Sequence, residues 1–152
     1  MDLTNCKAEI AIVYSSVTGN TKQVAEILYG GLLKRGHEAC LYEAADFLDA
    51  NLGQYKSLML GTYTWGSGEI PREMQDVYRT IESAADKHLV TGVFGTGDSF
   101  FPHYCGAVDR FRDMLYVRTT LAATLKIELM PQEQDHTRCQ KFLDAVLKRM
   151  DS

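Results

Sequence analysis

Short apolar segments and amphipathic segments alternate along the whole chain. The apolar segments are too short to be helices, and they occupy residues 9–14, 38–43, 57–62, 89–95 and 121–129. Apolar residues at helical spacing mark residues 21–34, 72–84, 107–116 and 139–150. Strands that alternate with helices form right-handed crossovers, so we expect an α/β fold in which helices cover both faces of a parallel sheet. Since no linker or repeat interrupts the alternation, we expect a single doubly wound domain over residues 1–152.

The composition excludes some classes of function. Hydrophobic residues make up 45% of the 152 residues and charged ones 24%, as in ordinary soluble globular proteins. A formal net charge of −4 argues against nucleic acid as the main partner, because phosphate backbones are bound by basic surfaces. No segment is long enough to span a membrane, and residues 1–8 lack the apolar core of a signal peptide, so we expect a cytoplasmic protein.

The cysteines are widely separated in the sequence, at Cys6, Cys40, Cys105 and Cys139. They form no C-x-x-C pair, which disfavours both a zinc site and a dithiol redox motif. We therefore expect all four to be reduced and at least partly buried.

Three unusual loops follow three of the predicted strands. Their sequences are SSVTGNT after the first strand, YTWGSGEIP after the third and TGDSFFPHYCG after the fourth. Each alone could be an ordinary turn, since turns are rich in Gly and Ser. In open parallel sheets, however, ligands bind beyond the carboxyl ends of the strands, where all three loops would meet. We therefore expect a binding site there.

The first loop has the composition of a phosphate site. It carries Ser16, Thr18, Asn20 and Thr21 around Gly19, at the start of a helix whose unpaired N–H groups favour an anion. No lysine or arginine lies between residues 14 and 21, so neutral donors would bind the phosphate of a tightly held cofactor. The G-x-x-x-x-G-K-[ST] motif of nucleoside triphosphate enzymes is absent, and GTGDSF lacks the third glycine of a dinucleotide site. A receiver domain would have acidic residues directly after the first strand, where this chain has Ser15 and Ser16, so that class of protein is also disfavoured.

The other two loops offer aromatic rings for a flat ligand. Trp65, the only tryptophan, stands between Tyr63 and two glycines, and the last loop offers Phe101 and Tyr104. A phosphate site between two aromatic loops suits flavin mononucleotide (FMN), with its ring between Trp65 and an aromatic residue of the last loop. The alternative is that these aromatics only cover the sheet edge.

Two neighbouring residues of the last loop are harder to assign. Phe100 fits a core position as well as a functional one. For His103 we expect a solvated loop residue; beside the flavin it would instead make the second reduction potential depend on pH.

With these loops the chain resembles a flavodoxin of the short-chain type over nearly its whole length. The matching motifs are SVTGNT at residues 16–21, TWG at 64–66, GTGDS at 95–99 and CGAVD at 105–109. The fifth strand runs through LKIELMPQE without the long insertion of the other subgroup. The resemblance implies a three-layer, flavodoxin-like fold with strand order 2-1-3-4-5. It also implies a low-potential one-electron carrier, not an enzyme, whose non-covalent FMN moves between quinone, semiquinone and hydroquinone states.

The resemblance also implies the residues that bind FMN. Gly66 would present its carbonyl to the N5 proton of the ring after a peptide flip, and Phe101 takes the outer stacking position where many flavodoxins have tyrosine. The implied set is Ser16, Val17, Thr18, Gly19, Asn20, Thr21, Tyr63, Thr64, Trp65, Gly66, Thr96, Gly97, Asp98, Phe101, Tyr104 and Cys105.

The implied partners are a flavodoxin or ferredoxin reductase as electron donor and redox enzymes as acceptors, both with basic docking patches. We expect the docking face to be locally acidic, with steering weakened by Lys22 and Arg72 nearby; its acidic residues would be Glu69, Asp98, Glu133 and Asp135. A carrier that exposes its flavin edge is expected to be a monomer. Two alternatives stay open, an FMN-dependent NAD(P)H quinone or nitro reductase and a regulatory module that has lost the cofactor.

Overall fold

The computed structural model describes residues 6–47 and 52–151. Its elements are β1 (Ile10–Tyr14), α1 (Asn20–Lys34), β2 (Cys40–Glu43), α2 (Ala44–Phe47), η2 (Leu52–Gln54), β3 (Ser57–Thr62), α3 (Arg72–Ala84), β4 (Val90–Gly97), α4 (Gly106–Arg118), β5 (Thr120–Glu128) and α5 (Asp135–Met150). Every predicted strand and helix is present. The prediction missed α2 and η2, because elements of three or four residues are too short to show a period.

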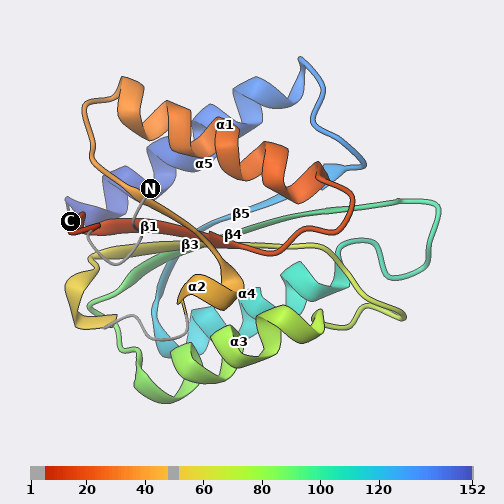
Figure 1. The fold of residues 1–152 in the computed structure, drawn as a ribbon, viewed down its shortest axis with the longest axis horizontal. Helices are drawn as coiled ribbons and strands as arrows, with labels where there is room; N and C mark the ends of the chain where they lie inside the picture. Colours follow the sequence, from red (N-terminus) through yellow and green to blue (C-terminus); the bar gives the residue numbers. More distant parts are fainter. Residues whose placement is uncertain (1–5, 48–51, 152) are drawn as a thin grey trace.

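The strands form one parallel sheet in the order β2-β1-β3-β4-β5. Figure 1 shows α1 and α5 on one face of this sheet and α2, α3 and α4 on the other. The predicted three-layer fold and strand order are therefore confirmed. In this arrangement the carboxyl ends of β1, β3 and β4, neighbours in the sheet, lie side by side.

An apolar core lies on each face of the sheet, because successive strand side chains point to opposite sides. Ala11 and Val13 of β1 belong to the cluster that includes side chains of α3 and α4. Ile12 and Tyr14 belong to the cluster that includes side chains of α1 and α5. All five residues of β1 are buried, as expected of a central parallel strand.

A glycine allows α4 to pack closely against the sheet near the carboxyl ends. A Cβ atom at Gly95 of β4 would lie 2.3 Å from the Val108 side chain of α4 and 2.4 Å from the carbonyl oxygen of Thr62. Any larger residue would push the first turn of α4 away from β4. Gly95 therefore helps to fix the start of α4 beside the loops that follow β3 and β4.

The cysteines differ from the prediction. Cys6 and Cys40 form a disulfide with a Cα–Cα distance of 5.9 Å, so the expectation of four reduced thiols was wrong for this pair. The fold brings the segment before β1 next to β2, which the sequence separation of 34 could not indicate. Gln54 holds the same segment by donating to the Cys6 and Ala8 carbonyls at 3.0 and 3.2 Å. Cys105 and Cys139 are free and buried, as expected.

Within residues 6–47 and 52–151, no helix combines the length and the apolar character that crossing a bilayer requires. The expectation that residues 1–8 lack a signal peptide concerns a segment that lies largely outside the described residues.

The disulfide predicts a measurable contribution to stability. Because it closes a sequence separation of 34, the double variant Cys6→Ala/Cys40→Ala should lose about 4 kcal/mol of unfolding free energy in urea. The wild-type protein in a thiol reductant should show the same loss, which separates the cross-link from packing effects of the substitutions. An unfolding free energy that reductant leaves unchanged would contradict a stabilising disulfide.

Candidate functional site

A cavity of about 550 Å³ opens at the carboxyl edge of the sheet. The first loop (residues 15–19, with the start of α1), the middle loop (63–71), the last loop (98–105) and the residue after β5 all contribute to it. Its volume lies in the range of cofactor sites in proteins. Its lining residues are Thr18, Asn20, Tyr63, Thr64, Gly66, Ser67, Thr96, Gly97, Asp98, Phe101, Pro102, His103, Tyr104, Cys105 and Leu129.

The first loop delivers neutral donors to the N-terminus of α1. Gly19 takes a left-handed conformation (φ 92°) directly before the helix, and its N–H donates to Ser16 Oγ at 3.1 Å. Thr18 and Asn20 line the cavity, where the first N–H groups of a helix have no intrahelical partner. With no basic residue in the loop, this end of the cavity offers hydroxyl, amide and backbone donors to an anion.

Some predicted residues of the first loop do not line the cavity. Thr21 is buried, and its hydroxyl pairs with that of Thr96 at 2.7 Å, so it joins α1 to β4 next to the cavity. Ser16 is committed to the Gly19 N–H, and Val17 is exposed to solvent. Thr21, Ser16 and Gly19 thus shape the loop.

The middle loop forms a tight turn. Trp65 and Glu69 exchange two backbone hydrogen bonds at 2.8 and 2.7 Å, and Gly66 and Gly68 within the turn both have positive φ. Glycine adopts this backbone region without the steric cost that other residues meet. We call residues 66–68, which this bridge encloses, the 66–68 turn.

The structure does not bring Trp65 into the cavity. Its side chain is 60% exposed and lines a separate groove of about 460 Å³ with Tyr63, Glu69, Ile70, Arg72, Glu73 and Gln75. The predicted exposure of Trp65 is confirmed, whereas a ring-binding role opposite Phe101 stays a prediction. In the same groove Tyr63 donates to the Glu73 carboxylate at 3.0 Å; burial and this bond raise the pKa of Tyr63 to about 12.

The last loop contributes aromatic side chains to the cavity. Phe101 lines the cavity, and the Phe100 ring contacts the Phe101 ring edge-on, with 6.0 Å between the ring centroids. Phe100 is 88% exposed, so a core position for it is wrong. The Asp98 carboxylate accepts the Phe100 N–H at 2.9 Å, which directs both rings outward from the end of β4.

Cys105, which is buried, and Tyr104, which is half-buried, line the cavity next to α4. Burial raises the pKa of the Cys105 thiol to about 11 and that of Tyr104 to about 12, so both are neutral at physiological pH. Cys105 takes a left-handed conformation directly before α4, and a Cβ atom at Gly97 would lie 3.0 Å from its sulfur. This part of the cavity is therefore closely packed and uncharged.

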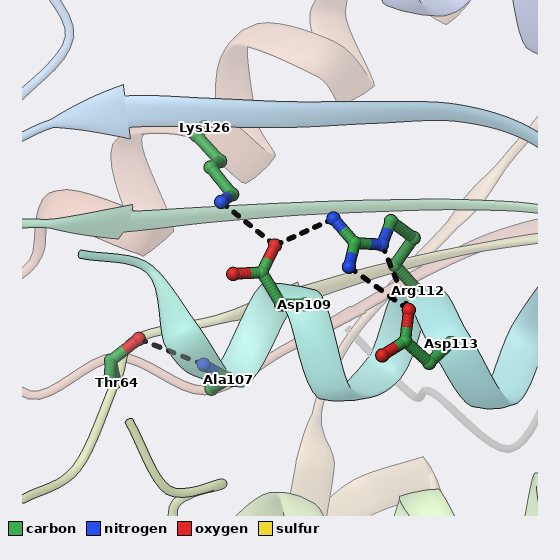
Figure 2. A network of polar contacts seen from close by, with 6 residues as sticks. All are labelled: Thr64, Ala107, Asp109, Arg112, Asp113 and Lys126. Atoms are coloured by element: carbon green, nitrogen blue, oxygen red, sulfur yellow. Dashed lines mark hydrogen bonds and ion pairs between the residues drawn. The ribbon is translucent and has the colours of Figure 1, made fainter. Parts of the chain in front are cut away.

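Ion pairs hold the first turns of α4 against β5. Figure 2 shows Asp109 between Lys126, at 2.8 Å, and Arg112, at 2.9 Å, with Arg112 also paired with Asp113. These side chains are partly exposed, so each pair is worth at most about 1 kcal/mol. Figure 2 also shows the Ala107 N–H donating to Thr64 Oγ1, at 3.2 Å, which links α4 to the middle loop.

Three of the four acidic residues predicted for the docking face are accessible to solvent. Glu69 and Glu133 are exposed and Asp98 is half-buried, and their role in docking stays a prediction. Asp135 is buried and was wrongly placed on this face. Its carboxylate accepts the Gln132 N–H at 2.8 Å and pairs with Arg138 at 3.1 Å, so it organises the start of α5.

The sequence prediction did not include Ser67, Pro102 and Leu129, which line the cavity, and placed His103 in solvent. His103 is exposed and also lines the cavity. Leu129 directly follows β5, and its N–H donates to the Gly97 carbonyl at 2.7 Å. Its place at the carboxyl edge was a usable signal, because every strand end there can contribute to the site.

The residues present suit a phosphate-bearing aromatic cofactor such as FMN. The cavity is lined by neutral hydrogen-bond donors at the start of α1 and by the aromatic side chains of Phe101 and Tyr104 from the last loop. Among the described residues, no group of three His, Cys, Asp or Glu side chains could hold a metal ion.

Comparison with known proteins gives consistent matches. A family model described as Flavodoxin matches residues 12–141. The chain is 33% identical over 147 residues to probable flavodoxin 1 of Bacillus subtilis, covering 95% of this chain and 93% of that protein. It is 34% identical over 131 residues to a flavodoxin of Maridesulfovibrio salexigens, covering 82% and 88%. The solved structure of oxidised flavodoxin 2 from Bacillus cereus matches with a TM-score of 0.82 at 35% identity, covering 93% of this chain and 99% of that one.

Proposed function

Since the chain belongs to the flavodoxin family, we propose that it carries electrons one at a time, at low potential, on non-covalently bound FMN. It is a short-chain member, with β5 uninterrupted over Thr120–Glu128. Flavodoxins are FMN-binding electron carriers rather than enzymes. The observation that carries the proposal is the cavity at the carboxyl edge, which is lined both by neutral donors of the first loop and by aromatic residues of the last loop.

The residues divide into a phosphate end and a ring end. Thr18, Asn20 and the free N–H groups at the start of α1 would bind the phosphate, because neutral donors and the helix dipole stabilise an anion there. Tyr63, Phe101 and Tyr104 would contact the ring. When bound, FMN supplies a ring system that takes up and releases single electrons.

The surroundings of the cavity favour a low potential. Aromatic side chains stacked on the ring would limit its contact with water, and the Asp98 carboxylate lines the cavity, so added negative charge would be costly there. A cost of about 1.4 kcal/mol lowers a one-electron potential by roughly 59 mV, since a single electron is transferred. Several modest contributions of this kind would together give the low potential of a carrier.

The proposed partners are a flavodoxin or ferredoxin reductase-type donor and redox-enzyme acceptors with basic docking patches. Glu69, Glu133 and Asp98 support docking on such patches, whereas Lys22 and Arg72 weaken the steering. We further propose that the protein is a cytoplasmic monomer. We also propose that the whole chain is one domain, which the single sheet shared by both apolar clusters supports.

A reductive titration tests the proposed function. Anaerobic dithionite added to the FMN-loaded protein should reduce it in two resolved one-electron steps, each with its own visible spectrum. The isolated protein should not oxidise NADPH, because a carrier depends on a separate reductase. A single two-electron step together with direct NADPH oxidation would contradict the carrier proposal in favour of a quinone or nitro reductase.

Gly66 offers a test of the ring end. Its φ is +52°, and an added Cβ would meet only the Glu69 carboxylate, at 3.8 Å, so Gly66→Ala has room for its side chain but strains the backbone of the turn. We expect a smaller separation between the two reduction potentials, measured by spectroelectrochemistry.

Gly36→Ala is the matched control for that variant. Gly36 also has positive φ (79°) and open space around it, but it follows α1 at the opposite end from the site. It should leave both potentials unchanged. Equal reduction potentials in Gly66→Ala and the wild type would show that Gly66 does not influence the flavin.

A further inference from the structure

The 66–68 turn has one end fixed and one end free. Gly68 is buried and makes close contacts with the start of α4, whereas Gly66 lines the cavity with open space beside its Cα. The bridge between Trp65 and Glu69 closes the turn but joins it only to itself. The fixed end therefore decides where the whole turn lies relative to the cavity.

Arg110 makes the directional contact at the fixed end. Its Nε donates to the Gly68 carbonyl at 3.0 Å, from the second turn of α4. A hydrogen bond from a charged donor is stronger than a neutral one. The other contacts of Gly68 are steric: a Cβ at Gly106 would lie 2.6 Å from Gly68 Cα, and one at Gly68 would lie 2.9 Å from His103 Cβ.

The helix that carries Arg110 is a firm support. Asp109, next to Arg110, is paired with Lys126 of β5, and Val108 packs against Gly95 of β4. Arg110 thus connects the 66–68 turn, through α4, to the central sheet.

We propose that Arg110 is a positioning residue that fixes Gly68 so that movement of the turn is confined to the Gly66 peptide. The inference rests on the proposed function, in which Gly66 faces the FMN ring. Without the bond from Arg110, only the steric contacts of Gly68 and the hydrogen bond from Ala107 to Thr64 would hold the turn, so it would move more as a unit and the Gly66 carbonyl would be less well fixed at the cavity. When the turn is anchored at Gly68, only the Gly66 peptide has to rotate. Glycine at this position, with its positive φ, permits the rotation.

Two substitutions separate the N–H donor from the charge. Arg110→Met keeps an unbranched side chain but removes both donor and charge. Arg110→Gln places an amide N–H where the arginine Nε stands and removes only the charge. The control is Arg118→Met on the same helix, because Arg118 also donates to a backbone carbonyl, that of Ala85 at 3.4 Å, but near the end of α4 farthest from the turn.

The first readout needs no cofactor. In FMN-free protein, hydrogen exchange of the Trp65 and Glu69 amides, measured by NMR, should become about fivefold faster in Arg110→Met, the equivalent of one net hydrogen bond. Arg110→Gln should exchange at nearly the wild-type rate, and Arg118→Met should not affect these amides. Unchanged exchange in Arg110→Met, or equal acceleration in the Met and Gln variants, would overturn the proposal.

The second readout is the pair of reduction potentials of the FMN-loaded protein. Their separation should shrink in Arg110→Met and recover in Arg110→Gln, which a purely structural role would not produce. Potentials of Arg110→Met that match the wild type would overturn the proposal. A wild-type protein that binds no FMN would refute the proposed function instead, while the amide exchange would still decide the role of Arg110.

Discussion

The parallel pairing of β1, β3 and β4 is the constraint on which the rest of the structure depends. Parallel strands end at the same edge of a sheet. Loops that are far apart in the sequence therefore meet at this edge, whatever their own sequences are. The register also sets the depth of each loop, since Tyr14 lies opposite Gly61 and Thr62 opposite Gly95. A cavity bounded by three loops follows from this pairing.

Helix α4 then serves as the support for two of those loops. Gly95 lets it approach β4, its Ala107 N–H donates to Thr64, and Arg110 donates to Gly68. The last loop runs directly into the same helix through Cys105. The middle and last loops are therefore positioned by one rigid element, whereas the first loop is positioned by α1 and the buried contact between Thr21 and Thr96.

The sequence predicted what depends on local pattern and missed what depends on tertiary contacts. Apolar runs and helical spacing gave the strands and helices, and the loop composition located the cavity around Thr18, Asn20 and Phe101. Two features had no local signal. The Cys6–Cys40 disulfide depends on the segment before β1 lying next to β2, and the burial of Asp135 depends on its folded-state contacts with Gln132 and Arg138.

In the proposed function, neutral donors at the start of α1 bind the phosphate of the cofactor. Calorimetric titration of cofactor-free protein with FMN and with riboflavin, which lacks the phosphate, measures their contribution. We expect one FMN per chain, bound roughly a hundredfold more tightly than riboflavin, because hydrogen bonds to a charged group are each worth about 1.5–3 kcal/mol. Equal affinities for the two ligands would contradict it.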